Sequence, residues 1–233
     1  MAVIEQAVQP KIVYPESDGQ PMAENTKQFR WIVTIKEGIE ALFKNVPDVF
    51  VAGDLFWYPL EGQPRIRLAP DAMVVFGRPK GDRGSYLQWQ EGGIAPQVVF
   101  EVLSPGNRLS EMIKKFQFYD RYGVEEYYIY DPDQFELNGW QRSADGELME
   151  IEVMNGWVSP RLGVRFELGR GELELYYPDG SKFATYLELV EQRDQAQQQA
   201  QQAQQQAQQA QNRAERLAAQ LRALGVEPET SDE

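Results

Sequence analysis

The feature that most constrains the fold is a strict spacing of small and apolar residues near the C-terminus. Alanine provides most of these residues, within a glutamine-rich stretch, and the gaps between them alternate between four and three, at Ala196, Ala200, Ala203, Ala207, Ala210, Ala214, Leu217, Leu221 and Leu224. A 4-3 repeat is the heptad pattern of a left-handed coiled coil. Alanine buries little apolar area, so we expect the three leucines to contribute most of the association. The alternative is a disordered glutamine-rich tract.

This repeat divides the chain into three parts. We predict a globular domain over residues 1–186, an Ala/Gln-rich coiled coil over 187–225 and an acidic tail over 226–233. Gly225 is a typical helix stop, and Pro228 prevents the helix from resuming. The coiled coil predicts a homo-oligomer, for which we favour a dimer. The repeat leaves open whether its helices are parallel or antiparallel.

The globular part has the pattern of a mixed α/β domain. Helical spacing of apolar residues predicts helices over residues 24–45 and 108–122. Strand-like segments occupy residues 49–58, 68–76, 96–103 and 126–130, and the third contains an apolar run typical of a central buried strand. Further short strands are expected over residues 148–153, 164–168 and 173–177, separated by turn residues.

The chain contains no cysteine and no histidine. Their absence excludes disulfides, cysteine nucleophiles, Ser-His-Asp triads and the usual zinc sites. Any chemistry must therefore use carboxylates, lysine, arginine or hydroxyl groups. A metal would be held by oxygen ligands, which favours magnesium, manganese or calcium.

The net charge is −13, and most of the negative charge belongs to residues before Leu187. This balance disfavours tight nonspecific binding to nucleic acids, although a carboxylate-rich metal site would contribute to it. No apolar stretch approaches the roughly 20 residues that span a bilayer. The N-terminus also lacks the pattern of a secretory signal. We therefore expect a cytoplasmic protein with no membrane partner.

Two acidic residues lie in or beside predicted strands. Glu101 interrupts the apolar run over residues 98–102, where an unpaired carboxylate would cost several kcal/mol unless a metal, a proton or a cation compensates it. Asp71 follows Pro70 at the start of another strand, although Pro-Asp is also common turn chemistry. Acids on neighbouring strands can share a metal ion, so these two residues are candidate ligands.

The helix predicted over residues 108–122 offers a cation. Its expected buried face consists of Leu109, Met112, Ile113, Phe116 and Tyr119. At about 100° per residue, Lys115 lies about 80° from the centre of this face, whereas Lys114 lies roughly opposite it. Lys115 can therefore reach inward past the packed face. The alternatives are a lysine that extends to solvent from the edge of the face, or an ion pair with Glu111 one turn earlier.

Five segments between Tyr14 and Tyr177 resemble, in order and spacing, the Uma2 family of restriction endonucleases, a branch of the PD-(D/E)XK nucleases. The segments are PESDGQPMAE, VAGDLFWYP, APDAMVVFG, PQVVFEVLSPGNR and KKFQFYDRYGVEEYYIYDP. The resemblance implies a restriction-endonuclease-like α/β fold, with a mixed sheet flanked by helices. It also implies that Asp71 and Glu101 hold the metal.

The resemblance also suggests which other residues take part in the reaction. Leu103 stands where the parent superfamily has a lysine, and the matching lysine of this family falls on Lys115. Glu24 resembles an additional acid of many such nucleases. Asp54 matches a frequent family acid, although a turn role is equally consistent, and Glu111 replaces the usual aspartate.

The resulting expectation is a magnesium-dependent endonuclease that hydrolyses DNA phosphodiester bonds, with manganese as a possible substitute. The catalytic residues would be Asp71, Glu101, Lys115 and Glu24, with Lys115 orienting or activating water and Glu24 aligning a ligand or a second water. The alternatives are an inactive nuclease-like domain that serves as an assembly module, and an RNase. The loop over residues 77–93 carries three cations that could touch a DNA backbone or simply be solvated.

Overall fold

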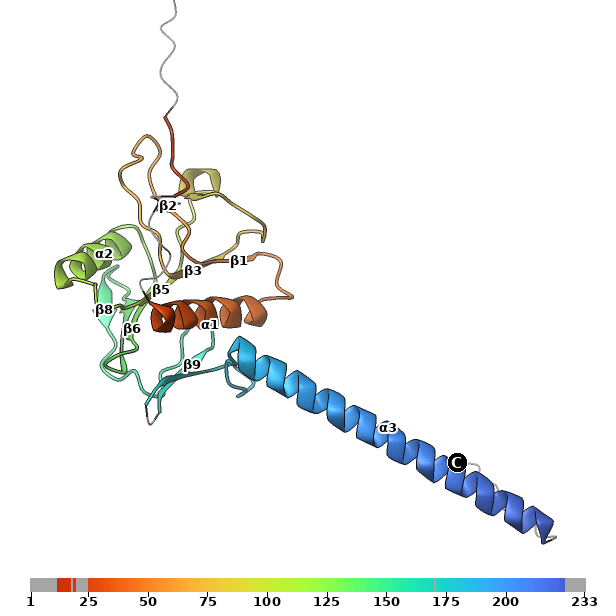
Figure 1. Ribbon diagram of the computed structural model, residues 1–233. Helices are drawn as coiled ribbons and strands as arrows, with labels where there is room; N and C mark the ends of the chain where they lie inside the picture. The colour runs from red at the N-terminus through yellow and green to blue at the C-terminus, as the bar shows by residue number, and fades with distance from the viewer. Residues whose placement is uncertain (1–11, 18, 20–24, 170, 225–233) are drawn as a thin grey trace, which may run out of the picture. The chain divides into compact units, whose positions relative to one another are not determined.

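The computed structural model describes residues 12–17, 19, 25–169 and 171–224, and it divides the chain into two compact units, Met1–Phe183 and Ala184–Glu233. The first unit contains a six-stranded mixed sheet (Figure 1). Its strands, in spatial order, are β1 (Val49–Ala52), β3 (Ala72–Phe76), β5 (Val98–Val102), β6 (Glu126–Asp131), β7 (Glu136–Arg142) and β8 (Leu148–Glu150). All neighbours are antiparallel except β5 and β6, whose parallel pairing requires the crossover helix α2 (Leu109–Arg121).

Each face of the sheet is covered by a separate hydrophobic cluster. On one face lie the helix α1 (Thr26–Leu42) and the hairpin of β9 (Arg165–Leu168) and β10 (Leu173–Tyr176). On the other face lie α2 and the short pair of β2 (Trp57–Tyr58) and β4 (Tyr86–Leu87), which is followed by a 3₁₀ turn, η1 (Gln88–Gln90). Because both faces are covered, the central strands are apolar on both sides, as the apolar run over residues 98–102 predicted.

Helix α1 begins where a side chain can cap it. Asn25 accepts a hydrogen bond from the main-chain N–H of Gln28 at 2.8 Å, which satisfies one of the free donors of the first turn. Its buried face includes Trp31, Ile32, Ile35 and Ile39. The side chain of Gln28 donates to the main-chain oxygen of Val102 at 2.8 Å, which fixes the start of α1 beside the C-terminal end of β5.

The strands differ from the sequence prediction in several places. The short strand β4 was not predicted, and the strands expected over 68–76 and 148–153 are shorter, at Ala72–Phe76 and Leu148–Glu150. The strand expected over residues 49–58 is two strands, since Asp54 adopts a left-handed conformation (φ +48°) and breaks the extended chain. Strand β7 was not predicted, because Gly139 weakens its β propensity. A Cβ atom on Gly139 would lie only 2.6 Å from Sδ of Met154 and 3.0 Å from the ring of Tyr128, so close packing requires glycine there.

The second unit contains one long helix, α3 (Tyr186–Ala223). Thr185 and Glu188 form a reciprocal capping box at its start. The helix predicted for this region is confirmed, and its heptad leucines are exposed in the single chain, Leu217 by 51% and Leu221 by 39%. No helix among the described residues is both long enough and apolar enough to cross a membrane.

Candidate active site

Two acidic side chains lie opposite each other at the ends of neighbouring strands. In the antiparallel register of β3 and β5, Met73 pairs with Val99. Continuing this register by two residues brings Asp71 opposite Glu101. Side chains two residues apart along a strand share a face, and both Met73 and Val99 pack in the cluster on the α2 side of the sheet. Both acids therefore face α2.

Glu101 is almost completely buried, with 2% of its surface exposed. Its Oε2 accepts a hydrogen bond from Nζ of Lys115 at 2.6 Å, and its Oε1 accepts one from the hydroxyl of Tyr119 at 2.5 Å. Lys115 and Tyr119 are four residues apart on α2 and so project from the same side of the helix. The ammonium and the hydroxyl together offset the cost of burying the carboxylate.

Asp71 is less well compensated. Its Oδ2 accepts a hydrogen bond from the main-chain N–H of Val102 at 2.6 Å. Burial raises the pKa of Asp71 well above its ordinary value of 3.8, and the neighbouring Glu101 charge raises it further, whereas Lys115 and the Val102 N–H act in the opposite direction. The buried Glu101 and the half-buried Asp71 thus share one nearby ammonium, an arrangement that favours an additional cation.

Lys115 reaches the acids from the edge of α2, as the helical geometry predicted. Its side chain is 24% exposed and Lys114 is fully on the solvent side. Burial lowers the pKa of Lys115, but the Glu101 and Asp71 carboxylates outweigh burial, so the net pKa is raised and the side chain stays charged. Glu111 caps its own helix instead, since its Oε2 accepts from the main-chain N–H of Arg108 at 3.3 Å.

The expected buried face of α2 was partly wrong. Leu109 and Ile113 are 79% and 49% exposed. The other three expected residues, Met112, Phe116 and Tyr119, do pack in the cluster, together with Phe118.

Asp71 and Lys115 line a pocket of about 590 Å³, whereas Glu101 is buried behind them and reaches it only through its bond to Lys115. Asp54 belongs to it, in the left-handed turn between β1 and β2, and its main-chain N–H donates to Pro70 O at 3.0 Å, which ties the turn to the residue before Asp71. The walls combine acidic, basic and apolar side chains, namely Asp54, Phe56, Arg65, Arg67, Leu68, Ala69, Asp71 and Lys115.

The donor set fits a small divalent cation. Asp71 and Glu101 supply oxygen ligands, and magnesium is commonly held by one or two carboxylates together with water and substrate phosphates. Within the part of the chain that the structure describes, no three acidic side chains are arranged to hold a metal. An ion here would therefore complete its coordination with water, main-chain oxygens or substrate. Glu24, the third expected acid, lies outside the described residues.

Sequence reasoning assigned Tyr119 only to the buried face of α2 and assigned no role to Arg65 or Arg67. The position of Tyr119 four residues after Lys115 places both on one side of the helix, but the contact of its hydroxyl with Glu101 depends on how α2 crosses the sheet. The two arginines reach the pocket from the irregular segment between β2 and β3, where periodicity gives no direction.

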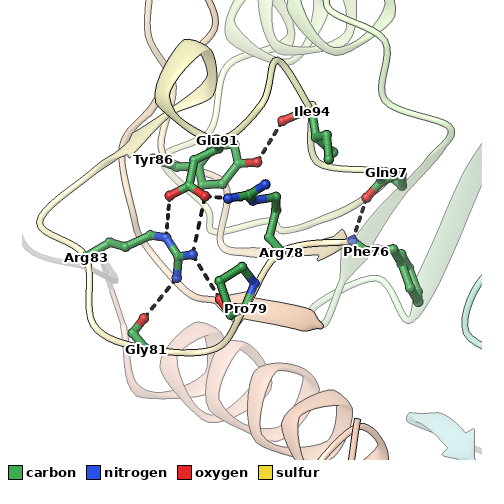
Figure 2. A network of polar contacts seen from close by, with 9 residues as sticks. All are labelled: Phe76, Arg78, Pro79, Gly81, Arg83, Tyr86, Glu91, Ile94 and Gln97. Carbon is green, nitrogen blue, oxygen red and sulfur yellow. Dashed lines mark hydrogen bonds and ion pairs between the residues drawn. The ribbon is translucent and has the colours of Figure 1, made fainter. Parts of the chain in front are cut away.

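The cations of the loop over residues 77–93 are engaged within the protein (Figure 2). Nε of Arg78 lies 2.8 Å from Oε2 of Glu91, and Nε of Arg83 lies 2.7 Å from its Oε1. Lys80 pairs with a glutamate of α1 at 2.9 Å. These ion pairs favour a structural role for the loop over contact with a nucleic acid.

Comparison with known proteins identifies the family of this chain. The family model Uma2, described as "Putative restriction endonuclease", matches residues 18–169. Five chains of solved structures match. One is the crystal structure of a "putative nuclease belonging to DUF820" from Anabaena variabilis, with 16% identity and a TM-score of 0.42, covering 62% of this chain and 79% of that chain. No curated protein matches. Since the family match spans more than half of the sequence, the chain belongs to the Uma2 family of restriction-endonuclease-like nucleases.

Proposed function

We propose that this protein is a metal-dependent endonuclease that hydrolyses DNA phosphodiester bonds at the pocket beside Asp71, Glu101 and Lys115. The observation that carries the proposal is the pairing of two opposed acids with one lysine at a pocket open to substrate. Membership of the Uma2 family supports it.

Asp71 and Glu101 would hold Mg²⁺, or Mn²⁺ in its place. Such an ion supplies Lewis-acid polarisation of the phosphodiester and activation of water at neutral pH. This chemistry needs no histidine or cysteine and so suits the composition of the chain.

The side chains have separate tasks in this mechanism. Lys115 presents a charged ammonium beside the acids, where it orients the attacking water and stabilises negative charge that develops on the phosphate. Tyr119 donates to the other oxygen of Glu101 and thereby fixes the orientation of this carboxylate. Glu24 aligns a further ligand or water.

The test is cleavage of DNA and RNA, each single- and double-stranded, by the full chain with Mg²⁺ or Mn²⁺ and with EDTA as control. We expect metal-dependent cutting of DNA that Asp71→Asn and Glu101→Gln abolish. Lys115→Met should lose about a hundredfold or more of the rate, the size typical of a lost charge-stabilising group. Lys114→Met is the matched control, since it removes the neighbouring exposed lysine and should cut at the normal rate.

Three outcomes would contradict parts of this proposal. Cutting of RNA alone would make the protein an RNase. A folded wild type that cuts none of the substrates would identify an inactive nuclease-like domain that serves in assembly. Equal loss in Lys114→Met and Lys115→Met would remove the specific role of Lys115.

We also propose that α3 associates with a second copy as a coiled coil, giving a homodimer whose two sites could act on opposite strands. None of its residues is buried in the single chain, although the heptad spacing places Leu217, Leu221 and Leu224 on one seam. Light scattering should show a dimer that Leu221→Asp dissociates. Ala219→Asp, on the outer face of the same helix, should leave it intact, and a wild-type monomer would refute the proposal.

A further inference from the structure

The segment that connects β2 to β3 forms much of the wall of the candidate pocket. Arg65, Arg67, Leu68, Ala69 and Asp71 all line it. Two cations and a candidate metal ligand therefore belong to one segment of the wall. The segment is anchored by a pair of main-chain hydrogen bonds between Trp57 and Leu68, at 2.8 and 3.3 Å.

Most cations elsewhere in the first unit have an acidic partner. Arg78 and Arg83 bind Glu91, and other lysines and arginines form pairs along the surface. Arg65 and Arg67 differ, since neither forms an ion pair with any residue that the structure describes. They are therefore positive charges without an acidic partner that line the candidate pocket.

Arg67 is also held in place. Its guanidinium lies over the ring of Phe56, 4.8 Å from the centroid, and 5.9 Å from that of Tyr58. One of its nitrogens donates to Pro64 O at 2.7 Å. A guanidinium has five N–H donors in a planar fork, so most of them remain for an anion, and phosphate matches this fork well.

We propose that Arg65 and Arg67 bind the phosphate backbone of a nucleic acid strand and bring one phosphodiester to Asp71 and Glu101. This inference rests on the proposed function, because it names how substrate reaches the same site. The fixed Arg67 sets the position of the phosphate, and the exposed Arg65 engages a neighbouring phosphate. The pair explains how a chain of net charge −13 can hold a polyanion at one place.

The test is binding of a fluorescein-labelled DNA duplex, and separately of an RNA duplex, followed by anisotropy over a range of salt concentrations. The full chain carries Asp71→Asn throughout, so that the probe is not cut. Arg65→Gln and Arg67→Gln should each weaken binding roughly tenfold near 0.1 M salt and lower the salt dependence by about 0.9 per lost contact on DNA. Arg67→Lys should keep the salt dependence because it keeps the charge.

Lys44→Gln is the matched control. Lys44 is exposed, forms no ion pair with a described residue and lies away from this pocket, yet its loss changes the net charge equally. Binding that both arginine variants weaken no more than Lys44→Gln overturns the inference, as does the absence of binding to either probe. If the arginines matter but the wild type cuts nothing, the inference holds and the proposed nuclease activity fails. Circular dichroism on each variant confirms that the fold is retained.

Discussion

The candidate active site and the loop network of Figure 2 both combine carboxylates with cations, but in opposite ratios. At the site, the buried carboxylate of Glu101 and the half-buried carboxylate of Asp71 share the single ammonium of Lys115. In the loop, the single carboxylate of Glu91 receives two guanidiniums. The pKa values follow this difference. Burial and the Glu101 charge raise the pKa of Asp71, whereas hydrogen bonds and charge from Arg83 and then Arg78 lower that of Glu91.

This contrast distinguishes a candidate binding site from an ion-pair network that stabilises the fold. A carboxylate with an excess of donors is stabilised within the fold and has little reason to bind another cation. A carboxylate such as Asp71, which lies beside a second acid and has few donors, carries a cost that an external cation removes. Asp71, whose charge is costly to the metal-free fold, is therefore assigned to function, and each side of the comparison can be tested separately.

The largest expected effect is stabilisation by a divalent cation. An ion that binds only the folded state at a hundred times its dissociation constant adds about 2.7 kcal/mol, or roughly 5–10 °C in Tm for a chain of this size. Thermal unfolding with Mg²⁺ or Mn²⁺ should show this shift in the wild type and in Glu91→Gln, but not in Asp71→Asn. A shift that survives Asp71→Asn would place the ion elsewhere.

The loop network should show its effect without metal. Glu91→Gln removes a carboxylate that is 15% exposed and leaves two guanidiniums without a counterion, so we expect a loss of about 2 kcal/mol at neutral pH. Because folding lowers the pKa of Glu91, its stabilisation is present above the ordinary value of 4.5 and is lost as the pH falls through the folded value. Urea titrations of both proteins should therefore converge in acid. A constant difference would mean that lost packing, not charge, is responsible.

Asp71→Asn should change the free energy of unfolding in the opposite direction to Glu91→Gln. The amide can still accept from the Val102 N–H, and it removes the repulsion with Glu101, so the metal-free fold should gain on the order of 1 kcal/mol. Folding raises the pKa of Asp71, so the cost of its charge is fully present above the folded value, decreases as the pH falls below it and is gone below the ordinary value of 3.8. The gain should be measured at neutral and acidic pH with EDTA. A variant less stable than the wild type at neutral pH would show that Asp71 is sufficiently compensated.

The sequence predicted the parts of the fold that follow from periodicity. Helices α1 and α2 and the central strands appear where apolar spacing placed them. Strand β7 was missed because it contains Gly139, which is unfavourable in a strand. The reason for this glycine is the close approach of Met154 and Tyr128, which belong to other parts of the chain. A single-sequence pattern contains no information about such a close approach.

In the candidate site, too, residues that follow from periodicity could be predicted, whereas those that depend on tertiary contacts could not. Glu101 could be found because it interrupts an apolar strand, and Lys115 because the angle along the helix directs it inward. Tyr119 was assigned to the core, because whether a tyrosine hydroxyl meets a carboxylate depends on how α2 crosses the sheet. Arg67 is positioned by two aromatic rings and a main-chain oxygen, none of which can be deduced from spacing.

The smallest expected effect is a loss of stability in Glu174→Gln. It separates the contribution of burial of a carboxylate from that of the number of its hydrogen-bond donors. Glu174, like Glu91, accepts from two donors, Nζ of Lys182 and the hydroxyl of Tyr176, both at 2.8 Å. Its pKa is likewise lowered, first by the hydrogen bond from Lys182. The lysine side chain is 47% exposed, however, so solvent screens the pair and Glu174→Gln should cost about 0.5 kcal/mol or less. Urea unfolding in low and high salt compares it with Glu91→Gln. Equal losses of stability in the two variants would show that the number of donors, not burial, makes the loop network strong. The contrast with Asp71 and Glu101 would then depend on the number of donors alone.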